Sequence, residues 1–421
     1  MDWKTTTLGK ICDQVGGIIQ TGPFGSQFHQ SDYSQEGIPL VMPKDIIEGR
    51  IKTDSIARVA PEHLERLSRH KLKSGDIVYG RRGDIGRQAL IRQPQAGWLC
   101  GTGCLRLSLS GSVIEPLFLH YYLRQSNVIG WIANQAVGAT LPNLNTGILR
   151  SVPVLLPPLP AQRKIAAILS AYDDLFENNL RRIKILEEMA QNLYREWFVK
   201  FRFPGHQHKR FIDSPLGQIP QGWEVKLLGN LADQIRDGIK PDSVDPETPY
   251  FGLEHLPRES ITPADWGFAS EVHSTKLLFK KGDILFGKIR PYFHKVGVAP
   301  LSGVCSSDTI VIRPRSTAWF GLILGCTSSV KFVEHASATS QGTKMPRANW
   351  DVLVKYQVPM PCQPILGQFN EFMNDIVNQL HNFVFRNQTL RCTRDLLLPR
   401  LISGEVDVSE LEITLPDEAA E

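Results

Sequence analysis

The chain has 421 residues, of which 42% are hydrophobic and 21% charged, so it is expected to form a folded protein of two or three domains. No apolar run approaches the roughly 20 residues of a membrane-spanning helix, and the first residues lack a signal-peptide pattern. The seven scattered cysteines include no CxxC pair, which argues against zinc and for a reduced, cytoplasmic protein. Residues 403–421 hold seven acids and no Lys or Arg; without them 47 basic residues face 36 acidic ones, a net charge of +11 that suits a nucleic-acid partner.

Taken in chain order, the predicted elements describe one unit written twice. The first unit covers residues 1–158, with strands at 76–79 and 105–109 and a helix at 117–133. A proline-rich stretch then sets the start of a long helix at 159–202, and a Pro- and Gly-rich linker follows at 203–222. The second unit repeats this order: a domain at 223–362 with strands at 283–286 and 309–312 and a helix at 318–336, a long helix at 363–402, and the acidic tail 403–421. Because strands and helices do not alternate regularly, we predict an α+β fold rather than a doubly wound sheet.

Three pairs of short motifs carry the duplication. Trp3-x4-Leu8-Gly9 recurs as Trp223-x4-Leu228-Gly229. The segment 75–81 recurs as 282–288, and 140–145 has a looser echo in 344–349. The two domains are therefore expected to share one fold.

The two long helices carry apolar seams with an unbroken 4-3-4-3 spacing, which is typical of helices that supercoil around each other. The first seam comprises Ile165, Leu169, Tyr172, Phe176, Asn179, Ile183, Leu186, Ala190, Leu193 and Trp197. The second comprises Phe369, Met373, Ile376, Leu380, Phe383, Asn387, Leu390, Arg394, Leu397 and Leu401.

An antiparallel pairing aligns both seams throughout and places their only two asparagines, Asn179 and Asn387, opposite each other. No parallel register that keeps the seams in phase does so. Such a pair would fix the helix register at some cost in stability. The alternative is that both asparagines face solvent at frayed points of the seam. Each helix has about 40 residues, or roughly 60 Å, and is expected to act as a spacer between two heads related by pseudo-twofold symmetry.

No catalytic or metal site is expected. The stretch Gly282-x4-Gly287-Lys288 imitates a phosphate loop, but Ile289 stands where magnesium binding needs Ser or Thr. A metal-dependent nuclease could use Asp213 with Glu224 and Lys226, although the acid lies in the linker. His206 and His208 have no companion ligands.

DNA is expected to contact polar loops that contain glycine and basic residues. Arg and Lys suit guanine, Gln and Asn suit adenine, and phosphates accept from any donor. The alternative for each residue is a solvated polar side chain, and only their clustering at duplicated positions favours a function. The candidates are Gln20, Thr21, Gly22, Ser26, Gln27, Lys44, Arg81, Arg82, Arg87, Asn143 and Asn145 in the first unit, and Lys288, Arg290, Lys344 and Arg347 in the second.

Several longer segments resemble the specificity subunit of type I restriction–modification enzymes. They are Thr21-Gly-Pro-Phe-Gly-Ser26, Leu141-Pro-Asn-Leu-Asn145, Leu156-Pro-Pro-Leu-Pro-Ala-Gln-Arg-Lys-Ile165, Leu193-Tyr-Arg-Glu-Trp-Phe-Val-Lys-Phe-Arg-Phe-Pro204, Ile219-Pro-Gln-Gly-Trp223 and Leu398-Pro-Arg-Leu-Ile-Ser-Gly-Glu405. The likeness covers nearly the whole chain. One departure lies before the second long helix, where residues 360–368 lack the Pro-Pro-Leu-Pro-Ala-Gln pattern.

The resemblance implies a non-catalytic subunit in which two target-recognition domains each read one half of a split, asymmetric site in double-stranded DNA. It also implies that the paired helices dock two methyltransferase subunits and, through them, the restriction and translocase subunits. S-adenosylmethionine, ATP and magnesium would then be held by these partners, which would perform N6-adenine methylation and ATP-driven cleavage. The departure leaves open whether the two docking surfaces are equivalent. An assembly scaffold without DNA specificity and a stand-alone nuclease remain the alternative hypotheses.

Overall fold

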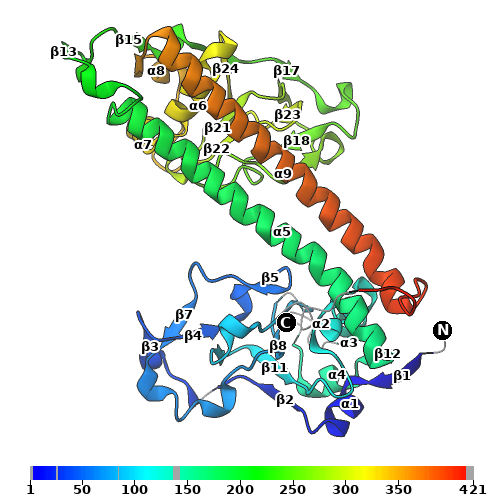
Figure 1. Ribbon diagram of the computed structural model, residues 1–421. Coiled ribbons are helices and arrows are strands. Elements are labelled where there is room, and N and C mark those ends of the chain that lie inside the picture. Colours follow the sequence, from blue (N-terminus) through cyan, green and yellow to red (C-terminus); the bar gives the residue numbers. More distant parts are fainter. Residues whose placement is uncertain (1–2, 25–26, 84, 136–142, 414–421) are drawn as a thin grey trace. The chain divides into compact units, whose positions relative to one another are not determined.

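The computed structural model describes residues 3–24, 27–83, 85–135 and 143–413, and it divides into two compact units. Unit 1 comprises residues 1–175 and 390–421, and unit 2 comprises residues 176–389 (Figure 1). Each unit joins one globular part to a segment of each long helix, α5 (Leu159–Tyr194) and α9 (Gln363–Ser403). The candidate Ser26, residues 140–142 of the predicted repeat and the acidic tail from residue 414 lie outside the described residues.

The globular part of unit 1 is α+β, as predicted, and its strands form several small sheets. The central antiparallel sheet has the order β2 (Ile18–Thr21), β11 (Cys104–Ser108), β8 (Ile77–Gly80), β9 (Gln88–Leu90). A second sheet has the order β10 (Leu99–Cys100), β4 (Ile38–Val41), β7 (Ala57–Val59), β3 (Tyr33–Ser34). Two-stranded sheets join β1 (Lys4–Thr7) to β12 (Pro153–Leu156) and β5 (Ile46–Ile47) to β6 (Arg50–Ile51). The helices are α1 (Leu8–Gln14), α2 (Pro116–Tyr122), α3 (Ser126–Gln135) and α4 (Thr146–Ser151).

Unit 2 repeats this plan. Its central sheet has the order β16 (Ala232–Ile235), β24 (Thr309–Pro314), β21 (Ile284–Gly287), β22 (Val296–Val298). The second sheet has five strands in the order β17 (Gly238–Ile239), β20 (Lys276–Phe279), β23 (Gly303–Cys305), β18 (Pro249–Phe251), β19 (Gly267–Phe268). The strand β15 (Glu224–Leu227) pairs with β25 (Gln357–Met360), and the helices are α6 (Phe320–Thr327), α7 (Val330–Ala338) and α8 (Trp350–Leu353). The internal duplication in the sequence therefore appears as the same strand order in the two central sheets, whereas the second sheets differ in strand number.

Three predicted elements differ in detail from the structure. The single helix predicted over 117–133 is two helices, α2 and α3, which are separated at residues 123–125. The helix predicted over 318–336 likewise breaks between α6 and α7, because the Ser329 side chain accepts a hydrogen bond from the Phe332 amide and so caps α7. The stretch predicted as a linker contains a hairpin of β13 (Phe211–Ser214) and β14 (Gly217–Pro220).

The long helices begin where the prolines predicted, at Leu159 and Gln363. The α-helical part of the first helix ends at Tyr194, where one π-helical turn follows at Arg195–Val199. The second runs to Ser403 and contains Pro399 in its last turns. All twenty seam positions are buried or half-buried, so the 4-3 spacing identifies the contact face of both helices correctly.

The two helices run antiparallel within each unit (Figure 1). In unit 1, Ile165 and Leu169 of α5 share an apolar core with Leu401 of α9. In unit 2, Trp197, in the π-helical turn that continues α5, packs against Phe369 of α9, with 5.6 Å between ring centroids. Since the start of each helix meets the end of the other, both contacts follow the register that the seams predict.

The two helix starts are chemically different. Gln162 of α5 is fully buried, where its amide accepts from the Glu115 backbone (2.8 Å) and donates to the carbonyls of Val113 (3.1 Å) and Pro157 (2.8 Å). The corresponding position of α9 is Leu366, which lies in the apolar core of unit 2. The departure from the proline-glutamine pattern thus replaces a polar anchor with an apolar one.

Candidate nucleic-acid interface

In unit 1, the loop that follows β8 lies between two other loops. The Arg81 amide donates to the Gly103 carbonyl (2.8 Å), and the Leu144 amide donates to the Arg81 carbonyl (2.9 Å). Arg82 then forms an isolated β-bridge with Asn143. Backbone hydrogen bonds therefore bring together three of the predicted candidates, and Arg82 is exposed while Arg81 donates from Nε to the Leu144 carbonyl (3.3 Å).

The loop after β2 joins the same cluster. The Gly22 amide donates to the Cys104 carbonyl (2.9 Å), and Thr102 Oγ1 donates to the Pro23 carbonyl (2.9 Å). A Cβ atom on Gly22 would lie 2.0 Å from the Gly101 carbonyl oxygen, so only glycine allows this close approach. Thr21 is half-buried at the end of β2. The glycine is thus needed for packing between loops.

Unit 2 builds the equivalent cluster from equivalent contacts. The Lys288 amide donates to the Asp308 carbonyl (2.8 Å), and the Ala348 amide donates to the Lys288 carbonyl (2.9 Å). The bridge between Ile289 and Arg347 corresponds to the bridge between Arg82 and Asn143 in unit 1. Each unit therefore presents basic residues on the loop that follows the third strand of its central sheet.

Two basic residues of this second cluster have constrained surroundings. Arg290 adopts a left-handed backbone conformation with φ 49°, which is unusual for a residue with a side chain, and its amide donates to the Pro346 carbonyl (2.7 Å). Arg347 lies 3.6 Å from the Asp308 carboxylate, measured from Nε to Oδ1. The backbone thus holds both side chains in a fixed loop.

The remaining candidates fall into two groups. Lys44, Arg87 and Lys344 are exposed, and the Arg87 carbonyl accepts from the Gly80 amide beside the first cluster. Asn145 has a structural use, because its side-chain oxygen accepts from the Ile148 amide (2.9 Å) and caps α4. Its counterpart in unit 2, Asn349, caps α8 in the same way.

The two glutamine candidates and Asn143 differ in how their amides are used. Gln20 donates from Nε2 to the Arg69 carbonyl (2.6 Å). The Oδ1 of Asn143 and the Oε1 of Gln27 are buried without a hydrogen-bond partner among the described residues. Unpaired buried polar atoms are uncommon in folded proteins, and Arg290 Nε in unit 2 is likewise buried without a hydrogen-bond partner among the described residues.

The sequence candidates were polar residues, glycines and basic residues, so two exposed apolar side chains beside the clusters were not among them. Phe24 is 58% exposed beside the first cluster, and Met345 is 44% exposed beside the second. The available signal was an apolar side chain next to a proline in a polar loop, as in Pro23-Phe24 and Met345-Pro346. Next to the first cluster, burial and the charge of Arg69 lower the pKa of His70 to about 4, so this histidine is neutral at pH 7.

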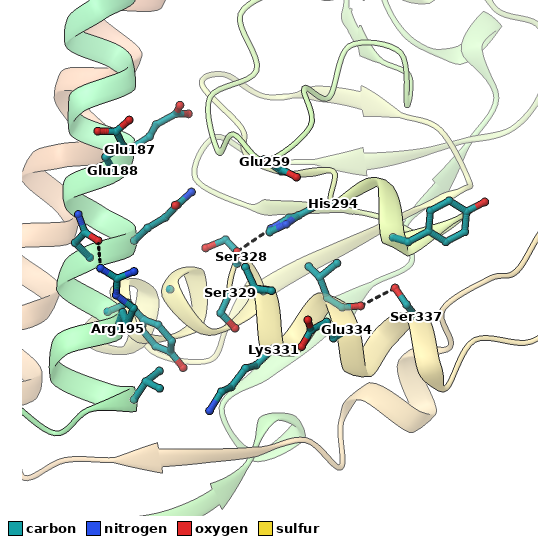
Figure 2. A pocket seen from close by; sticks show the side chains of 18 of the residues that line it. Glu187, Glu188, Arg195, Glu259, His294, Ser328, Ser329, Lys331, Glu334 and Ser337 are labelled. Carbon is teal, nitrogen blue, oxygen red and sulfur yellow. Dashed lines mark hydrogen bonds between the residues drawn. The ribbon is translucent and has the colours of Figure 1, made fainter. Parts of the chain in front are cut away.

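Unit 2 also contains a hollow of about 1220 Å³ between α5 and α7 (Figure 2). Its wall includes Tyr194 of α5 and Val333 of α7, and His294 closes one side by donating from Nε2 to the Ser328 carbonyl (2.8 Å). Figure 2 shows charged side chains of both signs along it, among them Arg195 and Glu334. A mixed rim over an apolar wall is typical of a protein-binding surface rather than of a phosphate site.

The acidic residues considered for a nuclease lie apart in the structure. They contain no group of three or more His, Cys, Asp and Glu side chains that could hold a metal ion. Asp213 and Glu224 lie exposed in different two-stranded sheets, and the Glu224 carboxylate pairs with Lys226 (3.4 Å). In the part of the chain that the structure describes, no helix is long and apolar enough to span a bilayer.

Comparison with known proteins points to a single family. The family model for the type I restriction modification DNA specificity domain matches residues 1–188. The chain is 24% identical over 420 residues to the MjaIX specificity subunit of Methanocaldococcus jannaschii, which covers 97% of this chain and 95% of that protein. It is 28% identical over 348 residues to the EcoDI specificity subunit of Escherichia coli, covering 71% and 77% of the two chains.

Among solved structures, the S subunit of a type I restriction-modification system from M. genitalium has the same fold. The TM-score is 0.59 at 16% sequence identity, over 95% of this chain and 96% of that one. The first 188 residues thus match the family model of the type I specificity domain, and the chain as a whole is similar in sequence to type I restriction enzyme specificity subunits and in fold to one S subunit.

Proposed function

We propose that this protein is the DNA sequence-specificity subunit of a cytoplasmic type I restriction–modification complex and reads a split, asymmetric site in double-stranded DNA. The observation that carries the proposal is the pair of equivalent basic clusters, one in each unit, at the bridges Arg82–Asn143 and Ile289–Arg347. Two copies of one scaffold with different side chains would each read a different half of the site.

The proposal assigns methylation and cleavage to partner subunits. We infer that two methyltransferase subunits dock on the long helices and that the restriction and translocase subunits join through them. Exposed apolar side chains on the outer face of α5, such as Ile185 and Met189, and the hollow beside Tyr194 support a protein partner here. S-adenosylmethionine, ATP and magnesium would be bound by those partners, and this chain would carry no reacting group.

Selection from a random DNA pool tests the reading function. The full chain with its methyltransferase is expected to enrich one motif with two specified halves and an unspecified spacer. Arg82→Ala is expected to relax one half only, and Lys288→Ala the other half only. Lys281→Ala is the matched control, because this exposed lysine precedes β21 at the end opposite to Lys288.

The outcomes separate the alternatives. Enrichment of no motif by an intact complex would support the scaffold hypothesis. DNA cleavage by the chain alone that is lost in Glu224→Ala would support a nuclease. A single-unit variant that changes both halves of the motif would contradict the assignment of one half to each unit.

A further inference from the structure

The helix pairs contain two polar contacts within their buried faces. In unit 2, Asn179 Nδ2 donates to Asn387 Oδ1 at 2.8 Å, and the two residues are only 8% and 6% exposed. In unit 1, Arg394 Nη1 donates to Asp173 Oδ1 at 2.5 Å, and Asp173 is 3% exposed. Each contact joins α5 to α9.

The internal duplication relates every position of α5 to one of α9. The helix α9 begins 204 residues after α5, and β25 follows β12 by the same interval. The packing obeys this relation: Trp197 lies by Phe369 in unit 2, and their counterparts Leu401 and Ile165 share the core of unit 1. The two helices are thus equivalent in geometry.

At the four polar positions the helices are not equivalent in chemistry, because every counterpart is apolar. These counterparts are all buried in the apolar core of unit 2. They are Val377 for Asp173, Phe383 for Asn179, Ile183 for Asn387 and Ala190 for Arg394. Each polar contact therefore occurs once and is not repeated by the pseudo-twofold relation.

Helix pairing between two copies of the chain would place these polar residues against apolar ones. If α5 paired with α5 of another copy in the same antiparallel register, Asn179 would face Ile183 twice. If α9 paired with another α9, Asn387 would face Phe383 and Arg394 would face Val377. Burying an amide without a partner is costly, and so is a largely buried guanidinium that has lost its main counter-charge. Pairing α5 with α5 would create two unpaired amides. Pairing α9 with α9 would create two unpaired amides and two guanidinium groups that keep Asp395 but lose Asp173.

We propose that Asp173, Asn179, Asn387 and Arg394 restrict helix pairing to α5 with α9 and exclude either helix of a second copy. The penalty of a wrong pairing falls mainly on Arg394 and the asparagines, since Asp173 would keep its hydrogen bond from Tyr121 of its own unit (2.7 Å). If the proposed function holds, this restriction keeps two different DNA-reading units in one molecule. The pairing itself can be tested without DNA.

The test cleaves the full chain after folding, at a protease site inserted in the exposed turn at residues 215–216 between β13 and β14. Cleavage places α5 and α9 on separate fragments, which are unfolded together, refolded and counted by native mass spectrometry. The wild type is expected to give only pairs of one first and one second fragment. The variant D173V/N179F/N387I/R394A, which gives each polar position its apolar counterpart, is expected to approach a ratio of about 1:2:1 for the three pairings, the limit when no partner is preferred.

Two further variants keep the result interpretable. N179F/N387I changes only the amide contact and leaves the ion pair of unit 1 in place, so it is expected to fold and to give a smaller fraction of like-with-like pairs. Leu169→Met copies the counterpart Met373 at a position that is apolar in both helices, and it is expected to behave as the wild type. Like-with-like pairs in the wild type would overturn the proposal. The proposal would also be overturned if the N179F/N387I and quadruple variants fold but form no such pairs. Partner choice would then depend on the helix ends, where Tyr194 packs on Gly325.

Discussion

Replacing Asp173 by alanine is expected to lower the unfolding free energy of unit 1 by about 3 kcal/mol. The buried carboxylate accepts hydrogen bonds from Arg394 Nη1 (2.5 Å) and the Tyr121 hydroxyl (2.7 Å), and Arg124 Nη1 lies 3.6 Å from Oδ2. It therefore joins α5, α9 and α2. Its removal would leave two largely buried guanidinium groups without their main counter-charge.

The magnitude follows from what remains after the substitution. Breaking one side of a buried ion pair costs about 3–5 kcal/mol. The lower end applies here, because Arg394 keeps Asp395 (2.8 Å) as an exposed partner and its own side chain is 15% exposed. Asp174→Ala is the matched control: the neighbouring carboxylate is exposed and forms a surface ion pair with Arg92 (3.4 Å), so its loss is expected to cost about 0–1 kcal/mol.

Hydrogen exchange read by mass spectrometry is the suitable assay, because it reports local opening and so resolves unit 1 from unit 2. Peptides from the end of α9 and from α2 are expected to lose protection in Asp173→Ala, whereas peptides of the unit 2 sheets are not. Equal losses in Asp173→Ala and Asp174→Ala would refute the reasoning. That result would mean that the free-energy cost of burying the carboxylate equals the stabilisation from its hydrogen bonds and ion pairs.

The same carboxylate makes unit 1 sensitive to acid. Burial alone would raise the pKa of Asp173, but hydrogen bonds from Arg394 and Tyr121 and the positive charges of Arg394 and Arg124 hold it below its ordinary value of 3.8. A lowered folded-state pKa means that the contribution is fully present above pH 3.8 and is lost as the pH falls through the folded value. Asp173→Asn is expected to remove that part of the acid dependence, measured as the difference in unfolding free energy from wild type across pH 2 to 5.

Three other predictions concern unit 2. Burial outweighs the hydrogen bonds from Ser260 and Thr262 and raises the pKa of Glu187 above 4.5, so the unfolding free energy of unit 2 should fall as the pH rises through the folded-state pKa. Glu187→Gln should abolish this fall in a pH series of unfolding free energies. Glu188→Gln, at an exposed neighbouring position, should leave the fall unchanged. Asn179→Leu leaves the amide of its partner buried and unpaired and is expected to cost about 1–3 kcal/mol in denaturant unfolding, most of which the added partner substitution Asn387→Leu should restore. Lys344→Ala is expected to weaken DNA binding by the complex and to lower the slope of log affinity against log salt by about one, in titrations where Lys281→Ala changes neither.

The sequence predicted the helices well and the polar contacts unevenly. A 4-3 seam is visible because helix packing repeats one requirement, apolar contact, over thirty residues. The alignment of Asn179 with Asn387 followed from the same arithmetic. The Asp173–Arg394 pair did not, because Asp173 lies one position off the seam, and its burial depends on Tyr121 and Arg124 of a globular part distant in sequence. A tertiary contact of this kind has no local pattern.

The candidate interface shows the same division. Basic residues at duplicated positions were expected to mark a contact surface, and backbone hydrogen bonds join the loops that carry them in each unit. In unit 1 this close packing also needs Gly22. Residue type alone could not separate Asn145, which caps α4, from Asn143, whose oxygen is buried and unpaired among the described residues. The two roles differ in backbone geometry rather than in chemistry.

The long helices also differ in charge at equivalent positions where they contact the globular parts. Glu187 of α5 accepts from Ser260 Oγ (2.6 Å), Thr262 Oγ1 (2.6 Å) and the backbone amide between them in unit 2. Its counterpart on α9 is Arg391, which donates to Glu48 (3.2 Å) in unit 1. An acid that accepts from three donors on one helix and a base that donates to an acceptor on the other therefore hold equivalent helix positions. The duplication has thus kept the packing geometry of the two halves while the charges at equivalent helix positions have diverged.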